Sequence, residues 1–267
     1  MAETLQDLST YAKDLILEAG ELIRASFPRT LDITTKSNPN DLVTNMDKEI
    51  EQFFIERIKK TYPSHRILGE EGYGDEIERL DGYVWMIDPI DGTMNFIHQQ
   101  RNFAVSVGIY QDGIGQVGLI YDVVSDELYH AVKGEGLTVN GEQLPRLEET
   151  RVSESIIALN AFWLTKNRRL PDGLLTPLAR DARGTRSYGS AALELVYVAT
   201  GRVDAYMSPR LSPWDIAAGI IMVEEAGGVA TDMRGKELTL LGESSLFVAR
   251  PGLHQEIIEN YLKRGEW

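Results

Sequence analysis

Cysteine is absent from all 267 residues of the sequence. Disulfides, zinc–thiolate sites and thiolate nucleophiles are therefore excluded. A reducing, cytoplasmic setting agrees with this composition. The four histidines are scattered and form neither an HExxH nor an Arg-His-Gly pattern, so we do not expect histidine-based zinc or phosphohistidine chemistry.

Long apolar runs are also lacking. No stretch approaches the roughly 18 apolar residues that a membrane-spanning helix needs. The first 27 residues mix acidic with apolar side chains and contain no basic leading region. We therefore expect neither a secretion signal nor a membrane partner.

Basic side chains are scarce, since 27 Lys and Arg stand against 41 Asp and Glu, a formal net charge of −14. No basic face is visible, so nucleic acid is not an expected partner. An anionic substrate would be repelled unless bound cations reversed the local field. The charge balance therefore points towards metals.

The remaining composition, 43% hydrophobic and 25% charged, is that of an ordinary globular protein. The length suits two closely packed halves. A charged stretch, Glu142–Glu154, contains Pro145 and marks the predicted boundary. We expect residues 1–145 to form an α+β half and residues 146–267 an α/β half.

Apolar residues at helical spacing predict a helix that includes Leu5 to Ile23, with Pro28 beyond its end, and a second helix after Asp47. An Asp-Gly turn at residues 112–113 predicts a hairpin. The predicted strands cover residues 66–69, 83–87, 103–110, 115–121, 127–132, 156–159 and 203–207, and further helices cover residues 190–200 and 214–226. The pattern predicts packed layers of an α+β protein.

The segment Asp88–Thr93 carries the most informative chemistry. An apolar strand leads to Asp88, and Pro89 after it predicts a sharp, rigid turn where the chain leaves the sheet. The carboxylates of Asp88 and Asp91, with the Ile90 carbonyl between them, suit Mg²⁺. Gly92 permits close backbone approach, and a short helix over residues 93–98 would offer its first amides to an anion.

An acidic turn whose aspartates only cap a helix is the alternative to a metal site. Two further carboxylates favour a metal site over a helix cap. Glu70 follows another predicted strand, and Asp215 stands at the start of an apolar helix, although Asp215 alone would also read as an N-cap.

The sequence resembles the inositol monophosphatase family. Trp85–Phe96 resembles its first signature and Trp214–Gly228 its second, while residues 36–47, 69–71 and 186–192 match in the same order. The resemblance covers nearly the whole chain. It implies a layered α/β/α/β/α sandwich of the sugar-phosphatase type, two or three Mg²⁺ ions, inhibition by Li⁺, a homodimer, and hydrolysis of a small phosphorylated metabolite, above all inositol monophosphate.

The resemblance also implies residue roles. Glu70, Asp88 and the Ile90 carbonyl would hold one Mg²⁺, and Asp88, Asp91 and Asp215 a second, with a weaker third ion near Glu70 and Lys36. Thr93, hydrogen-bonded to Asp47, would work with Glu70 on a water that attacks in line without a phospho-enzyme. The residues expected to contact substrate are Asp91, Gly92, Thr93, Gly189, Ser190, Ala191, Ser208, Arg210 and Asp215.

On the substrate side, two positions depart from the family pattern. Ser208 stands where a glutamate contacts an inositol hydroxyl in eukaryotic members, and Arg210 stands where a small residue is common. Arg210 is either an exposed loop cation or a fork for a second anionic group. The second interpretation favours NADP or fructose 1,6-bisphosphate as substrate. A nucleotide phosphate is a further alternative within the family's chemistry.

Two other classes of protein fit the sequence less well. A haloacid-dehalogenase-type phosphatase needs one residue between its two aspartates, whereas Pro89 and Ile90 separate these. A non-catalytic binding module that kept the fold would generally lose metal ligands, and this chain retains them all.

Overall fold

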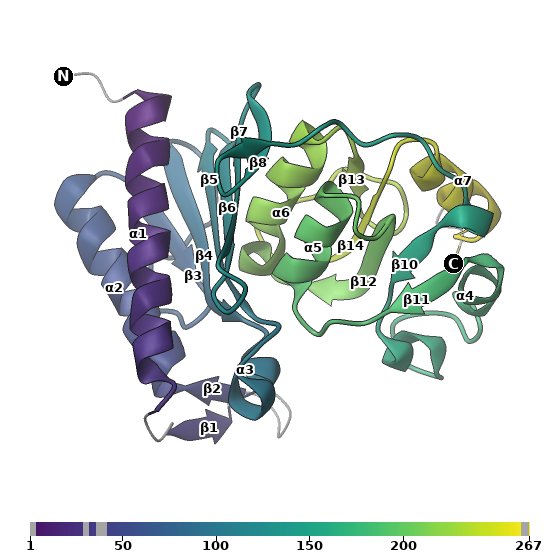
Figure 1. The fold of residues 1–267 in the computed structure, drawn as a ribbon, viewed down its shortest axis with the longest axis horizontal. Helices are drawn as coiled ribbons and strands as arrows, with labels where there is room; N and C mark the ends of the chain where they lie inside the picture. The colour runs from purple at the N-terminus through teal and green to yellow at the C-terminus, as the bar shows by residue number, and fades with distance from the viewer. Residues whose placement is uncertain (1–3, 29–31, 36–41, 263–266) are drawn as a thin grey trace.

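The computed structural model describes residues 4–28, 32–35, 42–262 and 267. Helices and sheets alternate as layers across the molecule (Figure 1). Two long helices cover one face of a seven-stranded sheet, two helices lie between it and a five-stranded sheet, and two short helices lie beyond. In the order of the layers these helices are α1 (Leu5–Ser26), α2 (Asn45–Thr61), α5 (Ala191–Ala199), α6 (Pro213–Glu225), α4 (Thr176–Asp181) and α7 (Leu253–Asn260). The predicted α/β/α/β/α sandwich is confirmed.

Both long helices begin with a capping box. In α1 the Thr4 side chain accepts from the Asp7 amide, and the helix ends at Ser26, before Pro28. Helix α2 begins two residues before Asp47, not after it as predicted, because Thr44 is the N-cap and Asp47 occupies the third helical position.

The large sheet has the strand order β3-β4-β5-β6-β7-β8-β9 and is antiparallel except between β3 and β4. Asp112 and Gly113 have positive φ angles of 52° and 79° and form the predicted hairpin turn between β5 and β6. The strands are β3 (Arg66–Gly69), β4 (Tyr83–Asp91), β5 (Ala104–Gln111), β6 (Ile114–Asp122), β7 (Glu127–Val132), β8 (Gly136–Val139) and β9 (Glu142–Gln143).

The smaller sheet has the order β11-β10-β12-β14-β13. Its strands are β10 (Ile156–Ala158), β11 (Gly184–Arg186), β12 (Ala205–Leu211), β13 (Val229–Thr231) and β14 (Ser244–Ala249). The other elements are β1 (Ile33–Thr35), which pairs with β2 (Leu42–Thr44), the short helix α3 (Thr93–Gln99), and the 3₁₀ helices η1 (Val152–Glu154) and η2 (Ala161–Leu164). The division of the chain at residues 145 and 146 stays a prediction.

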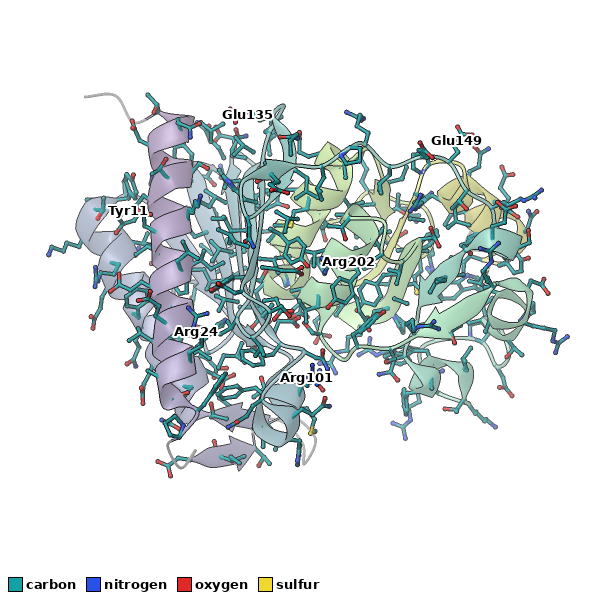
Figure 2. The ribbon with its side chains drawn as sticks, in the orientation of Figure 1. Tyr11, Arg24, Arg101, Glu135, Glu149 and Arg202 are labelled. Carbon is teal, nitrogen blue, oxygen red and sulfur yellow. The ribbon has the colours of Figure 1, made fainter. Side chains whose placement is uncertain are left out.

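Strand β4 is buried on both faces, which explains its continuous apolar run. Val84 and Met86 pack into the core around α5 and α6, whereas Trp85 and Ile87 pack into the core under α1 and α2. This alternation is the two-residue period of a strand. Side chains fill the space between the layers (Figure 2).

Two glycines let α6 lie close against the large sheet. A Cβ on Gly108 would come within 2.8 Å of the Ala217 Cβ, and one on Gly118 within 2.6 Å of the Ala218 carbonyl oxygen. Only glycine fits at these positions without displacing the helix. The start of α6, with Asp215, is thereby held near the end of β4.

A surface ion pair also links the end of α5 to the large sheet. Arg202, labelled in Figure 2, follows α5 and donates from both terminal nitrogens to the two Glu127 oxygens of β7, at 2.7 Å each.

Among the described residues, no helix is both long and apolar enough to cross a membrane.

Candidate active site

Strand β4 does not end at Ile87, and the predicted sharp turn at Pro89 is wrong. The strand continues to Asp91 through an irregular register against β5, where Asp88 pairs with Ser106 and Asp91 pairs with Ala104. One extra residue on β4 is thus accommodated as a bulge, which tolerates a proline without an amide hydrogen.

The bulge has a direct chemical consequence. Residues three apart in a regular strand point to opposite faces of the sheet. The extra residue between Asp88 and Asp91 brings both carboxylates to the same side. One carboxylate oxygen from each, and one from Asp215, all lie within 4.8 Å of one another.

Asp215 reaches this cluster from the first turn of α6. Ser212 is the N-cap and its amide donates to the Asp215 Oδ2 at 2.7 Å, so Asp215 closes a capping box at the third helical position. The N-cap interpretation of Asp215 is therefore wrong, and the residue combines a helix-start role with membership of the cluster.

Backbone and hydroxyl donors orient the two β4 aspartates. The Ile90 amide donates to Asp88 Oδ1 at 3.0 Å. The Ala192 amide donates to Asp91 Oδ2 at 2.7 Å, and the Ser190 hydroxyl donates to the same oxygen. The start of α5 thus fixes Asp91, as the start of α6 fixes Asp215.

The electrostatics of the cluster favour a bound cation. Burial, followed by the charges of Glu70 and Asp91, raises the pKa of Asp88 well above its usual value. Burial and the charge of Asp91 do the same for Asp215, and burial raises the pKa of Asp91 to about 6. Several buried carboxylates that repel one another are a donor set that a divalent oxygen-seeking ion fits.

Glu70 lies at this cluster as well. Its amide donates to the Ile87 carbonyl at 3.3 Å, which holds the end of β3 beside β4. Its carboxylate contributes to the raised pKa values of Asp88 and Asp215. Lys36, expected near a third ion, lies outside the described residues.

Asp47 and Thr93 form the hydrogen bond that the resemblance implies. Thr93 Oγ1 donates towards Asp47 Oδ1 at 3.1 Å, and the Ile90 carbonyl oxygen lies at the same distance. Asp47 Oδ2 accepts from the Thr44 amide at 2.8 Å. Burial is the main reason that the pKa of Asp47 is raised.

Gly92 connects the bulged strand to α3, which begins at Thr93 as predicted. Its φ of 96° favours glycine, and a Cβ there would lie 3.1 Å from the Asn102 carbonyl oxygen and 3.2 Å from the Ser190 Cβ. The amides of Gly92 and Thr93 therefore follow the cluster directly along the chain.

A cavity of about 270 Å³ opens beside the cluster. Its lining includes the predicted residues Asp91, Gly189, Ser190, Ala191, Ser208 and Asp215. Prediction missed the other lining residues, which are Asn160, Trp163, Glu194, Tyr206, Met207 and Leu211.

Arg210 is not part of this lining. It lines a different groove, where its Nε donates to Glu243 at 2.7 Å. Ser208, two residues earlier, does line the cavity beside the cluster. The structure therefore separates the two positions that depart from the family pattern.

Glu194 is the most informative of the missed residues. It is only 4% exposed, accepts a hydrogen bond from the Tyr188 amide at 2.7 Å, and has its pKa raised to about 7 by burial. A single acid within the apolar run of α5 was the available signal, since acids are rarely buried without a specific partner.

Comparison with known proteins assigns the chain to a family. A family model described as "Inositol monophosphatase family" matches residues 4–265. The chain belongs to the inositol monophosphatase family. It is 56% identical over 256 residues to an inositol-1-monophosphatase of Bacillus subtilis, covering 96% of this chain and 97% of that one.

Solved structures of family members share this fold. Staphylococcal IMPase-II with inositol monophosphate bound has a TM-score of 0.86 and 44% identity, covering 96% of this chain and 93% of that one. The same protein with 2'AMP bound has a TM-score of 0.88 and 46% identity, covering 96% and 94%. Both ligands are phosphate monoesters.

Proposed function

We propose that this protein hydrolyses the phosphate ester of inositol monophosphate in a Mg²⁺-dependent reaction. The observation that carries the proposal is the meeting of Asp88, Asp91 and Asp215 within 4.8 Å at the edge of a cavity. The 56% identity to an inositol-1-monophosphatase supports the same substrate.

We infer that Glu70, Asp88 and the Ile90 carbonyl would hold one Mg²⁺, and that Asp88, Asp91 and Asp215 would hold a second. When bound, such ions neutralise phosphate charge and lower the pKa of water into the neutral range. A third ion near Glu70, and inhibition by millimolar Li⁺, stay predictions. Phosphate release measured against Li⁺ concentration tests the latter.

Thr93 and Glu70 orient the attacking water in this proposal. Because Thr93 donates its hydroxyl hydrogen to Asp47, the lone pairs of Oγ1 remain to accept a hydrogen bond from water. The Glu70 carboxylate takes up a proton from that water. The amides of Gly92 and Thr93 donate to phosphate oxygens. Attack is direct, so no phosphorylated aspartate forms.

The cavity wall supports recognition of a polyol leaving group. Ser208, Asn160 and Glu194 line it and supply hydroxyl, amide and carboxylate groups that can bind inositol hydroxyls. A nucleotide phosphate is a second candidate, because Trp163 also lines the cavity and offers a stacking surface for a base. NADP and fructose 1,6-bisphosphate remain further substrate alternatives.

The decisive experiment measures phosphate release from inositol 1-phosphate with Mg²⁺ and with EDTA, then compares kcat/KM across inositol 1-phosphate, 2'-AMP, NADP and fructose 1,6-bisphosphate. We expect activity only with Mg²⁺ and the highest kcat/KM for inositol 1-phosphate. A roughly tenfold higher kcat/KM for another substrate would overturn the proposal that inositol is the leaving group. Trapping a phosphorylated Asp88 would overturn the mechanism.

A cytoplasmic homodimer is also proposed from the family resemblance. Light scattering after size exclusion should then give twice the chain mass of 29.9 kDa. Cell fractionation tests the location.

A further inference from the structure

A second acidic residue of α2 is buried one turn after Asp47. Glu51 has no solvent exposure. Residues four apart lie on the same face of a helix, so Asp47 and Glu51 face the same region. The remaining buried positions of α2, Met46, Ile50, Phe54 and Ile58, are apolar.

Both carboxylate oxygens of Glu51 bind the chain segment that follows β3. The Glu71 amide donates to Oε2 at 2.6 Å, and the Tyr73 amide donates to Oε1 at 2.8 Å. Glu70 is the residue directly before Glu71. Glu51 therefore holds the backbone from which the Glu70 side chain projects.

Gly69 brings this segment into direct contact with Glu51. A Cβ on Gly69 would lie 2.5 Å from Oε2 and 2.6 Å from Oε1 of Glu51. Those distances are impossible for real atoms, so a side chain at residue 69 would push the carboxylate or the loop away. Residues on both sides of Glu70 thus depend on the position of one buried carboxylate.

Burying a carboxylate is unfavourable unless hydrogen bonds replace its water. An apolar side chain at residue 51 would extend the apolar face of α2 without that cost. The pair of amide hydrogen bonds is therefore the specific result of having glutamate here. Charged acceptors form stronger hydrogen bonds than neutral ones, which suits a rigid anchor.

We propose that Glu51 is a positioning residue for Glu70. One rigid helix then sets both groups that act on the attacking water, since Asp47 holds Thr93 and Glu51 holds the Glu70 loop. Four residues of helix rise about 6 Å, and this fixed spacing sets the separation of the two anchors. The inference rests on the proposed function.

The test uses Glu51→Gln, which keeps the size but can accept with only one of its two terminal atoms. We expect kcat for inositol 1-phosphate to fall about 10- to 100-fold, as for groups that orient metal ligands. KM should change less than about threefold, because substrate contacts are intact. The Mg²⁺ concentration for half-maximal activity should rise. Glu56→Gln, the same change at an exposed position of α2, should leave all three values unchanged.

Gly69→Ala disturbs the same contact from the opposite side and should reproduce the loss in kcat. If both changes act through one contact, the double variant should lower kcat little more than the worse single variant does. This pair also covers the case in which one variant folds poorly. A purely structural role for Glu51 would lower the melting temperature without moving the Mg²⁺ requirement.

Unchanged kcat and an unchanged Mg²⁺ requirement in folded Glu51→Gln would overturn the inference. If the wild-type chain releases no phosphate from any substrate, the proposed function fails separately. Calorimetric titration of Mg²⁺ then decides the role of Glu51, since equal affinity in wild type and Glu51→Gln contradicts it and weaker affinity in the variant supports it.

Discussion

Thr93 Oγ1 and Asp47 Oδ1 lie 3.1 Å apart across 46 positions of the sequence. The other Asp47 oxygen accepts from the Thr44 amide and hydroxyl, so Thr44 fixes the carboxylate and the carboxylate orients Thr93. The start of α2 is thereby coupled to the start of α3 at the proposed reaction centre.

Thr93→Ala should therefore lower kcat strongly while it weakens substrate binding only slightly. Loss of a group that positions or transfers a proton costs about 10²- to 10⁴-fold, and the KM for inositol 1-phosphate should change little. Thr93→Ser is the matched control, because it retains the hydroxyl and the bond to Asp47. Steady-state kinetics of both variants check the prediction, and an equal loss in Thr93→Ser contradicts it.

Asp88→Asn should abolish activity yet stabilise the metal-free protein. Burial and the neighbouring carboxylates raise the pKa of Asp88, so removal of its charge relieves repulsion in the absence of metal. Loss of outer-sphere partners already costs about 10- to 100-fold, and loss of a ligand should cost more. Melting curves in EDTA and in Mg²⁺ measure both effects.

Asp122→Asn is the control for this prediction. Asp122 is also buried, but it is not one of the three clustered aspartates, and its Oδ1 accepts from the amides of Val124 and Ser125 at 3.2 and 3.0 Å. That variant should lower the melting temperature and keep the Mg²⁺-induced shift. A lower melting temperature of Asp88→Asn in EDTA would disprove the repulsion argument.

Arg210 should contribute to substrate binding only if it leaves Glu243. Arg210→Ala should raise KM for fructose 1,6-bisphosphate more than for inositol 1-phosphate, by about two- to fivefold, the range of exposed ion pairs. Glu243→Gln removes the charge that pairs with the guanidinium and should lower the same KM. An equal effect of Arg210→Ala on both substrates would show that Arg210 only stabilises the groove through Glu243.

Sequence patterns predicted the secondary structure well where the burial of apolar side chains alone determines it. The 3.6-residue periodicity of α1 and the apolar runs of β4 to β6 predicted those elements to within a few residues. Most apolar residues there are buried, with Leu22 and Ile114 as exposed exceptions, so pattern and packing largely agree. The acids at 88, 91 and 215 were selected by strand-end and helix-start positions; the structure retains the helix start at Asp215 and moves the strand end from Asp88 to Asp91.

Features that depend on distant partners were not predicted. The bulge at Pro89 arises from pairing with β5, and β12 continues past Pro209 because Leu211 pairs with Ser244. Glu51 and Glu194 looked like ordinary acids, although both stand at apolar helical positions. Their partners are backbone amides of loops, which leave no trace in residue identity.

Two histidines, the half-buried His130 and the buried His254, should make the protein less stable as the pH falls. Burial lowers the pKa of His130 and of His254 to about 4. The Nε2 atoms lie 2.7 Å from the Ser9 hydroxyl and 2.8 Å from the Thr231 hydroxyl, respectively. Both rings are therefore neutral and hydrogen-bonded in the folded chain at neutral pH.

The sign follows from proton binding. An unfolded histidine has a pKa of about 6.5, so between pH 6.5 and 4 the unfolded chain binds more protons than the folded chain. The contribution of these neutral histidines to the free energy of unfolding is fully present above about pH 6.5 and declines as the pH falls towards 4. Protonation of the metal-site aspartates acts in the opposite direction, so saturating Mg²⁺ must be present throughout.

The measurement compares melting temperatures at pH 7 and pH 5. The wild-type chain should lose several degrees, and His130→Asn and His254→Asn should each show a smaller loss, because asparagine does not titrate. His98→Asn, a change at an exposed histidine, should retain the wild-type loss. Equal losses in all four proteins would mean that carboxylates, rather than buried neutral imidazoles, control acid sensitivity.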